Sequence, residues 1–143
     1  MEFIQLLVQI NEIFHSYITR YKEEFIGSSK YSDVTVNQLI YLEAIFHLGN
    51  PTVSELADHL KISRASASVG VGKLVKSGLA QKTQSADDSR VHHVGLSKEG
   101  SALIQAEVKA LSAFAEKITG ALSEDEIKTL VEIFQKVVSK SRE

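Results

Sequence analysis

A run of small, hydroxylic and basic side chains begins at Arg64 and extends to about Ser77 without a single acidic residue. Arginine can donate two hydrogen bonds to guanine, serine hydroxyls can donate or accept, and an alanine methyl group can touch a thymine methyl group. The side chains expected on the exposed side of this segment are Arg64, Ser66, Ala67, Ser68, Gly70, Val71 and Lys73. This combination favours contact with the edges of bases in double-stranded DNA, with Arg64, Ser66, Ala67 and Ser68 as the reading residues.

A second candidate group lies in the polar turn from Ser85 to Arg90. A long basic side chain at the tip of a hairpin can enter a DNA minor groove, where negative potential attracts arginine. Asp88 lies two residues before Arg90 and can hold its guanidinium through a charge-assisted hydrogen bond. The alternative is that Asp88 and Arg90 form an ordinary surface ion pair of little energetic value. The lysines expected to contact phosphate are Lys73, Lys76 and Lys82.

The residues before this run form the pattern of a helix-turn-helix. Thr52 and Glu55 make a T-x-x-E capping box, which predicts the start of a first helix. A short turn follows at Lys61, Ser63 can cap the second helix, and Gly78 lies just past its end, where a left-handed residue commonly closes a helix. Two helices joined by three or four residues are the helix-turn-helix plan, in which the second helix enters the major groove.

Two short segments after the second helix, Leu79–Gln84 and Val91–Leu96, are predicted to pair as a hairpin around the polar turn. A basic hairpin that follows a recognition helix is a wing. Within the helix, Gly70 and Gly72 each cost about 1 kcal/mol relative to alanine. Close packing or close approach to DNA are the two candidate reasons for their presence.

These residues resemble the MarR family of winged helix-turn-helix transcriptional regulators. The matching stretches are TVSELADHLKIS, KLVKSGL and DSRVHHVGLSKEG. The third fits the family's D-x-R…L-[TS]-x-x-G wing signature at Asp88, Arg90, Leu96, Ser97 and Gly100. The pair of glycines in the recognition helix departs from the family, which usually has larger polar residues there.

The resemblance also implies regulation by a small-molecule effector, often phenolic, lodged between the DNA-binding region and the dimer helices. The aromatic residues expected near that junction are Tyr17, Tyr41, Phe46 and Phe114.

Amphipathic helices are predicted on both sides of the winged region. Apolar residues at helical spacing run from Phe3 to Phe25, and a break is expected at 27–29. A T-x-x-Q box at Thr35 starts the next helix, whose apolar residues predict heavy burial for Leu39, Leu42, Ala44, Ile45, Phe46 and Leu48.

Ser97 can cap a long helix to about Thr119 with an inner face of Leu103, Ala106, Ala110, Leu111, Phe114 and Ile118. A final helix is expected after the box of Ser123 and Glu126, with Ile127, Leu130, Val131, Phe134, Val137 and Val138 on its apolar face.

The fold class expected is mainly α: a winged helix-turn-helix with a three-helix core and a two-stranded wing, and with N- and C-terminal helices that form a dimerisation region. The divisions are 1–34, an N-terminal dimerisation helix and linker; 35–100, the DNA-binding region; and 101–143, the C-terminal dimerisation helices. A twofold homodimer would present two recognition helices about 34 Å apart, which suits a pseudo-palindromic DNA site. The alternative is that both terminal helices fold back on one monomer.

The charge distribution supports a nucleic-acid partner although the whole chain carries −2. From Lys61 to Lys98 there are seven Lys and Arg and two acids, so this segment carries +5 and the remainder carries −7. A basic patch on an acidic body is typical of DNA-binding proteins. No apolar run is long enough to span a membrane and no signal peptide is recognisable, so a cytoplasmic protein without a membrane partner is expected.

Other chemistry finds little support in the sequence. There is no cysteine, which excludes disulfides and thiolate ligands. No phosphate-binding glycine loop or nucleophile motif is present, so no enzyme and no cofactor are expected. No metal site is expected because the histidines lack metal-binding spacing; they are His15, His47, His59, His92 and His93. His92 and His93 are expected to be exposed wing residues.

The function predicted from these observations is a dimeric, sequence-specific DNA-binding transcriptional regulator. We expect a repressor that binds a pseudo-palindromic operator and is released by a small ligand. Two alternatives remain: a winged-helix module that binds protein, which would more often expose apolar residues on its second helix, and a metal-responsive regulator.

Overall fold

The structure is a computed structural model that describes residues 2–26 and 34–141. Within these ranges the elements are α1 (Glu2–Ile26), α2 (Val36–Leu48), α3 (Val53–Leu60), α4 (Arg64–Lys76), β1 (Ala80–Gln84), β2 (His92–Leu96), α5 (Lys98–Gly120) and α6 (Glu124–Lys140). The predicted mainly helical, winged helix-turn-helix fold is confirmed. The predicted break at 27–29 lies outside the described residues.

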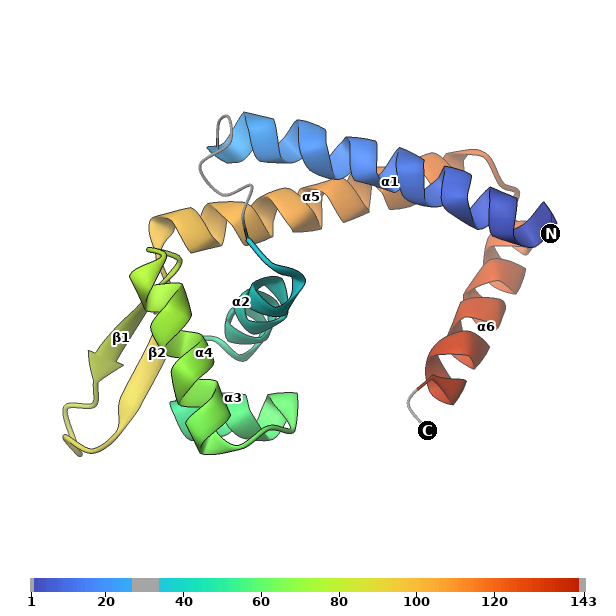
Figure 1. The fold of residues 1–143 in the computed structure, drawn as a ribbon. Coiled ribbons are helices and arrows are strands. Elements are labelled where there is room, and N and C mark those ends of the chain that lie inside the picture. The colour runs from blue at the N-terminus through green and yellow to red at the C-terminus, as the bar shows by residue number, and fades with distance from the viewer. Residues whose placement is uncertain (1, 27–33, 142–143) are drawn as a thin grey trace.

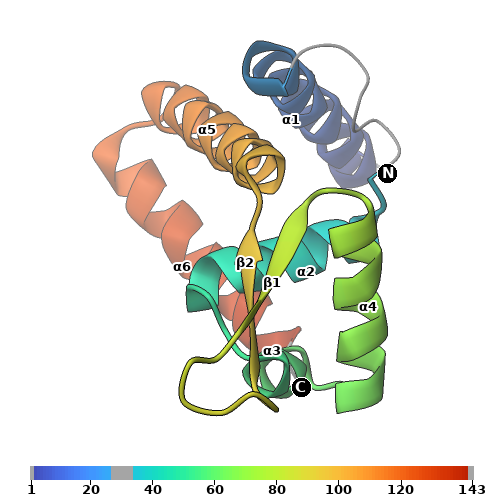
Figure 2. The same cartoon turned by 90° about the vertical axis from the view of Figure 1, so that its left-hand side faces the viewer.

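Three parts make up the molecule, as Figure 1 shows. Helices α1 and α5 lie side by side and form a long arm. One end of the arm carries the head, which consists of α2, α3, α4 and the β1–β2 hairpin. Helix α6 turns back from the other end of the arm. Figure 2 views the molecule from the head, where α4 and the hairpin lie toward the viewer.

The helix starts are set by local hydrogen bonds that the sequence predicts. In three reciprocal capping boxes, a hydroxyl accepts from the backbone N–H three residues later, and the side chain there accepts from the cap's own N–H. The three pairs are Thr35 and Gln38, Thr52 and Glu55, and Ser123 and Glu126. In the last pair, the hydrogen bonds from the Ser123 backbone and side chain hold the pKa of the Glu126 carboxyl below its ordinary value.

The turn of the helix-turn-helix is built without glycine. Helix α3 ends at Lys61, which takes a left-handed conformation with φ 56°. The Ile62 N–H donates to the Ala57 carbonyl at 3.0 Å, and the Ser63 hydroxyl caps α4 by accepting from the Ser66 N–H at 3.1 Å. The predicted cap and the closing glycine are confirmed, because Gly78 follows α4 with φ 75°.

The core of the head extends into the arm. Fully buried side chains from α2, α3, α4, the hairpin and α5 pack together, and they include Leu42, Ile45, Leu56, Val71, Leu74, Leu79, Val94, Leu103 and Ile104. Each contributes roughly 1.5–3 kcal/mol by leaving water. Because Leu103 and Ile104 belong to α5, the same core fixes the head to the arm.

The wing is a two-stranded antiparallel sheet in which Ala80 pairs with Leu96 and Gln84 pairs with His92. Its strands lie within one residue of the predicted segments. A third segment joins it, because Thr52 forms an isolated bridge with His93 and the Val94 N–H donates to the Pro51 carbonyl at 2.8 Å. The wing is thereby tied to the loop that precedes the helix-turn-helix.

The base of the wing is held by the end of the wing signature. The buried Ser97 hydroxyl donates to the Gly78 carbonyl at 2.6 Å and accepts from the Gly100 N–H at 3.0 Å. The Ser97 N–H donates to the Leu79 carbonyl at 3.1 Å. A Cβ atom on Gly100 would lie less than 3.0 Å from that same carbonyl oxygen. Ser97 and Gly100 therefore join the end of α4, the first strand and the start of α5 at one point.

Aromatic side chains and one ion pair hold the arm together. The Phe114 ring of α5 lies 5.2 Å from the Phe14 ring and 6.2 Å from the Tyr17 ring of α1, measured between centroids. Lys22 of α1 pairs with Glu107 of α5 at 3.0 Å between Nζ and Oε1. Part of the N-terminal helix thus packs on α5 of the same chain.

Many apolar side chains of the terminal helices remain exposed in this single chain. They are Phe3, Ile4, Leu6, Leu7, Val8, Ile10 and Ile13 on α1, and Val131, Ile133, Phe134, Val137 and Val138 on α6. Helix α6 has no buried residue. The predicted burial of Phe46, Leu48 and Leu111 is wrong, since all three are exposed. None of the helices in the described ranges is both long and apolar enough to cross a lipid bilayer.

Candidate nucleic-acid interface

Helix α4 is anchored on the head by Ala67, Val71 and Leu74, which are all fully buried. Their spacing of four and three residues places them on one side of the helix. The expectation that Ala67 and Val71 belong to the exposed side is therefore wrong. Ala67 has an exposed fraction of 0% and its methyl group packs in the core, so it is not a base-reading side chain.

The side of α4 opposite this anchor projects away from the head. At 100° per residue, the positions farthest from the buried side are Ala65, Val69, Gly72 and Lys76, and all four are exposed. The sequence interpretation missed Ala65 and Val69. The exposed side of α4 could have been found from Val71 and Leu74, whose large apolar side chains mark the buried side. Alanine gives no such signal, because it suits a buried and an exposed position equally.

The first turn of α4 is partly occupied by hydrogen bonds within the head. The Ser63 hydroxyl donates to the Ser66 hydroxyl at 2.9 Å, and the Arg64 guanidinium donates to the Ser54 hydroxyl of α3. Arg64, Ser66 and Ser68 are nevertheless exposed. The bond to Ser54 uses one nitrogen of the Arg64 guanidinium and leaves donors free for another partner.

The two glycines of α4 have different surroundings. A Cβ atom on Gly70 would lie less than 3.0 Å from the Tyr41 ring of α2, whereas one on Gly72 would meet no atom within 4 Å. The Tyr41 hydroxyl also donates to the Ser66 carbonyl at 3.3 Å. Close packing therefore explains Gly70. Gly72 has no packing reason within the described chain, so close approach to DNA stays a prediction for this position.

Alanine substitutions at these two positions are expected to change stability in opposite directions. Gly70→Ala should lower the free energy of unfolding by about 1–3 kcal/mol because the Tyr41 ring must move. Gly72→Ala should raise it by about 0.5–1 kcal/mol because alanine favours an exposed helix interior. Urea denaturation of both variants measures the difference, and shifts of the same sign would contradict the distinction drawn between the two sites.

The wing tip brings Asp88 and Arg90 together as predicted. Asp88 Oδ1 accepts from the Arg90 backbone N–H at 2.9 Å and from Arg90 Nε at 3.3 Å. The exposed fraction of the Arg90 side chain is 90%, against 44% for Asp88. The turn is further braced by Gln84, whose amide donates to the Ser89 carbonyl at 2.6 Å. The guanidinium is thus held at its base while its outer nitrogens face solvent.

The two wing histidines are less exposed than expected. Both are half-buried, and His93 Nδ1 lies 3.0 Å from the Asn50 carbonyl oxygen. This contact belongs to the bridge between the wing and the loop before α3. Among the described residues, no three His, Cys, Asp or Glu side chains gather as a group that could hold a metal ion.

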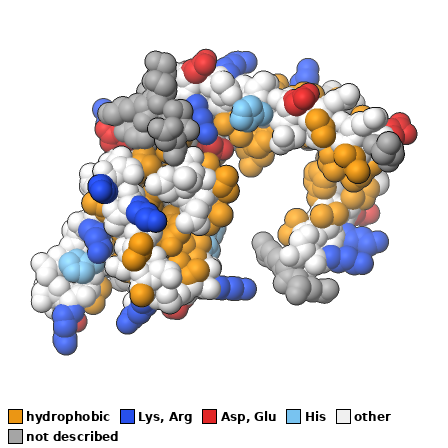
Figure 3. Space-filling view, in the orientation of Figure 1, with side chains coloured by type: hydrophobic (Ala, Val, Ile, Leu, Met, Phe, Trp, Pro, Cys, Tyr) orange, Lys and Arg blue, Asp and Glu red, His pale blue; other side chains and the backbone are white. Residues whose placement is uncertain are grey.

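Exposed cations gather over α4 and the wing. Lys73 and Lys76 project from the last turns of α4, Lys82 from β1 and Arg90 from the wing tip, and all are exposed. Figure 3 shows Lys and Arg side chains on this part of the head among mostly uncharged ones. The surface formed by the outer side of α4 and by the wing, called here the helix–wing face, is rich in cations and contains a protruding helix of small side chains.

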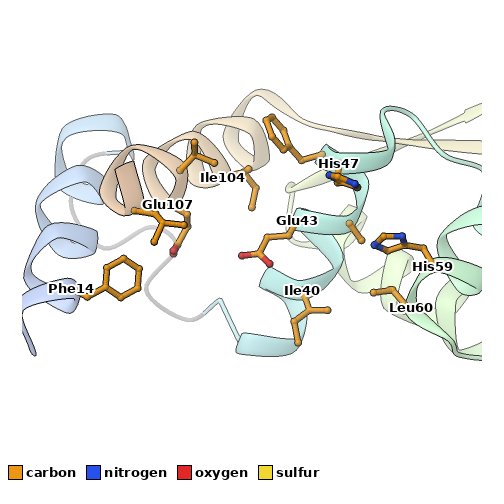
Figure 4. Close-up of a pocket in the computed structure, with 12 residues that line it drawn as sticks. Phe14, Ile40, Glu43, His47, His59, Leu60, Ile104 and Glu107 are labelled. Carbon is orange, nitrogen blue, oxygen red and sulfur yellow. The ribbon is translucent and has the colours of Figure 1, made fainter. Parts of the chain in front are cut away.

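A cavity of about 570 Å³ lies between the head and the arm. Its lining comes from α1, α2, α3 and α5, and consists of Phe14, Ile40, Glu43, Ala44, Phe46, His47, His59, Leu60, Ile104, Glu107, Val108 and Leu111. Figure 4 shows Glu43 and Glu107 reaching toward the open space from opposite elements, with Phe14 on the arm side. Of the four aromatic residues expected near this junction, only Phe46 lines the cavity. Tyr41 packs on Gly70, and Tyr17 and Phe114 pack within the arm.

Comparisons with known proteins agree with the winged helix-turn-helix fold described above. Residues 32–91 match a family model described as MarR family. No curated protein matches the chain by sequence.

Solved structures share the fold over nearly the whole chain. FabT of Streptococcus pneumoniae, solved in complex with DNA, is 18% identical with a TM-score of 0.71, and the match covers 98% of this chain and 97% of that one. A point mutant of S. aureus MepR, bound to an oligodeoxyribonucleotide, is 19% identical with a TM-score of 0.60 and 96% coverage of both chains. Wild-type MarR from E. coli in its apo form is 22% identical with a TM-score of 0.58 and 93% coverage of both.

Proposed function

We propose that this chain is a MarR-family transcriptional regulator, which the match of residues 32–91 to the family model supports, and that it acts as a homodimeric repressor on a pseudo-palindromic operator. In this proposal the protein is a transcription regulator and not an enzyme. The work of such a regulator is done on chromosomal DNA, so the proposal places it in the cytoplasm.

The observation that carries this proposal is the helix–wing face. Four cations, Lys73, Lys76, Lys82 and Arg90, are exposed on the same part of the head as a helix without acidic residues. Of the two acids in the wing turn, Asp88 is already paired with Arg90. Cations on a protruding helix and hairpin neutralise phosphates and release counterions, which gives affinity for duplex DNA.

The roles proposed for individual residues follow their positions. Arg64, Ser66 and Ser68 lie on the first turns of α4, which would enter the major groove and face base edges. Val69 and Ala65 add methyl groups that suit contact with thymine. The absence of a side chain at Gly72 would let the helix approach the duplex closely. Lys73, Lys76 and Lys82 would contact phosphate, and Arg90 would enter the adjacent minor groove.

The dimer is proposed from the apolar surface that this single chain leaves in water. The exposed apolar side chains lie on the first half of α1 and along α6, and α6 turns back beside an open space (Figure 1). A large group of exposed apolar side chains on neighbouring helices is typical of a protein–protein interface. In this proposal residues 1–34 and 101–143 form the dimerisation region and residues 35–100 form the DNA-binding region.

The cavity between head and arm is the proposed effector site. Its volume suits a small molecule, and it touches both the head, through α2 and α3, and the arm, through α1 and α5. A ligand there would change the spacing of two heads in a dimer, and an operator accepts only a narrow range of spacings. Release of DNA on ligand binding follows from that geometry.

Selection of bound duplexes from a random DNA pool tests the DNA-binding proposal directly. The expected product is a site with two inverted half-sites whose centres lie about one helical turn apart. Enrichment of no sequence, or of a single asymmetric half-site, would contradict a dimer that reads an operator.

Arg90→Ala is expected to weaken operator binding by about tenfold and to lower its salt dependence. If each wing neutralises one phosphate, the slope of log affinity against log salt should fall by just under 2 for a dimer. Fluorescence anisotropy at several salt concentrations measures both quantities. The control is Arg20→Ala on the exposed side of α1, which removes an arginine outside the helix–wing face. Unchanged affinity and slope in Arg90→Ala would count against the wing assignment.

A further inference from the structure

We propose that the cavity between head and arm selects an organic cation with one positive charge and an apolar body. This inference rests on the proposed function, because it names the chemical class of the effector that the cavity would take. It concerns the charge of the ligand, which the resemblance to the MarR family does not fix.

The lining of the cavity accounts for the apolar body. Eight of the side chains that line it are Phe14, Ile40, Ala44, Phe46, Leu60, Ile104, Val108 and Leu111, and all are apolar. The two aromatic rings come from α1 and α2, which form opposite sides of the space. Phe46 and Leu111 are exposed although they are large and apolar, so a bound apolar group would remove both from water.

The charged side chains account for the positive charge. The remaining lining residues are Glu43, His47, His59 and Glu107, and no lysine or arginine is among the lining residues. Glu107 is compensated by its 3.0 Å ion pair with Lys22 at the arm. Glu43 makes no ion pair or hydrogen bond with the described residues. Among the described residues, the Glu43 carboxylate therefore has no compensating charge, and it complements one positive charge on a ligand.

The same arrangement disfavours an anion. A ligand carboxylate or phenolate in the cavity would face the uncompensated Glu43 carboxylate, and Lys22 is already paired with Glu107. The histidine rings of His47 and His59, whose centroids lie 6.0 Å apart, border the other end of the cavity (Figure 4). Their flat rings can stack on the aromatic body of a ligand.

The position of the carboxylates also connects binding to the head. Glu43 belongs to α2 and Glu107 to α5, so a cation between them contacts the head on one side and the arm on the other. Attraction of the cation to Glu43 on the head, together with contact between the apolar body and the apolar α5 side chains, would hold the two parts together around the ligand. This gives a cationic ligand a means of changing the angle of the head.

Three ligands with the same ring system test the proposal by isothermal titration calorimetry on the full chain: 2-naphthylmethylammonium, 2-naphthol and 2-naphthoate. The ammonium compound should bind about tenfold more tightly than either of the others, as expected for a charge-assisted contact. Glu43→Gln should weaken binding of the ammonium compound about tenfold and leave binding of 2-naphthol unchanged. Glu116→Gln removes an exposed carboxylate from α5 outside the cavity and should change neither.

Each other outcome overturns the proposal. Binding of 2-naphthol or 2-naphthoate as tight as that of the ammonium compound would show that charge does not decide selection. Equal affinity of the wild type and Glu43→Gln for the ammonium compound would remove the role of that carboxylate, and failure of all three compounds to bind would remove the site. Operator binding of the wild type and of Glu116→Gln, measured without ligand, separates this result from a failure of the DNA-binding proposal, because that measurement does not involve the cavity.

Discussion

Gly100→Ala is expected to lower the free energy of unfolding by at least about 3 kcal/mol, with a fall in the thermal midpoint on the order of 10 °C. A methyl group at this position would overlap the Leu79 carbonyl oxygen, and it would also lie close to the Leu79 carbonyl carbon. That carbonyl cannot move aside freely, because it accepts the Ser97 N–H at 3.1 Å. The substitution must therefore separate the start of α5 from the base of the wing.

The matched control is Gly120→Ala in the same helix. A Cβ atom there would meet nothing within 4 Å, so the variant should unfold within about 1 kcal/mol of the wild type. Thermal and urea denaturation followed by circular dichroism compare the two variants. Equal stability of Gly100→Ala and Gly120→Ala would mean that the wing and α5 are not packed as closely as described.

Phe134→Glu is expected to convert the proposed dimer into a monomer and to weaken operator binding by at least about a hundredfold. Phe134 is 56% exposed in the single chain and lies among the apolar residues of α6, and burial of such a ring in an interface would contribute roughly 1.5–3 kcal/mol. A charge in its place would instead be desolvated without a partner. A monomer binds one half-site at a time, so it loses the gain in affinity that a dimer obtains by binding two half-sites together.

Light scattering after size exclusion measures the mass, and anisotropy with a labelled operator measures the affinity. The monomer mass is 15.8 kDa, so the wild type should appear at about twice that value. Ser139→Glu adds the same charge to the polar side of α6, where it is exposed, and should remain dimeric. A wild type that is monomeric, or a Phe134→Glu variant that stays dimeric, would count against α6 as part of the interface.

The helix boundaries could be predicted from sequence because they depend on local chemistry. Thr52 and Glu55 satisfy each other's backbone N–H groups within a single turn, and the same holds for Ser123 and Glu126. Gly78 is recognisable as a helix end because few other residues adopt a positive φ readily. None of these features requires knowledge of how distant segments pack.

The wrong predictions concern which side of a helix is buried and which side is exposed. A DNA contact is predicted for Ala67 because small residues suit base edges, but small residues also suit a tight core, where Ala67 lies. Large apolar side chains predict a core position for Phe46 and Leu111, yet both line an open cavity between head and arm. An apolar side chain in a sequence pattern predicts burial. The pattern does not indicate whether the same chain, a second subunit or a ligand covers that side chain.

The contact between Tyr41 and Gly70 has a mechanical consequence. Helix α2 presents Glu43 and His47 to the cavity, and from the same turns it presses the Tyr41 ring into α4 where the glycine leaves no side chain between them. Because the Tyr41 ring packs closely on Gly70, we expect a tilt of α2 to displace α4 with it. In the proposed function, a molecule in the cavity would in this way move the helix that is proposed to enter the major groove.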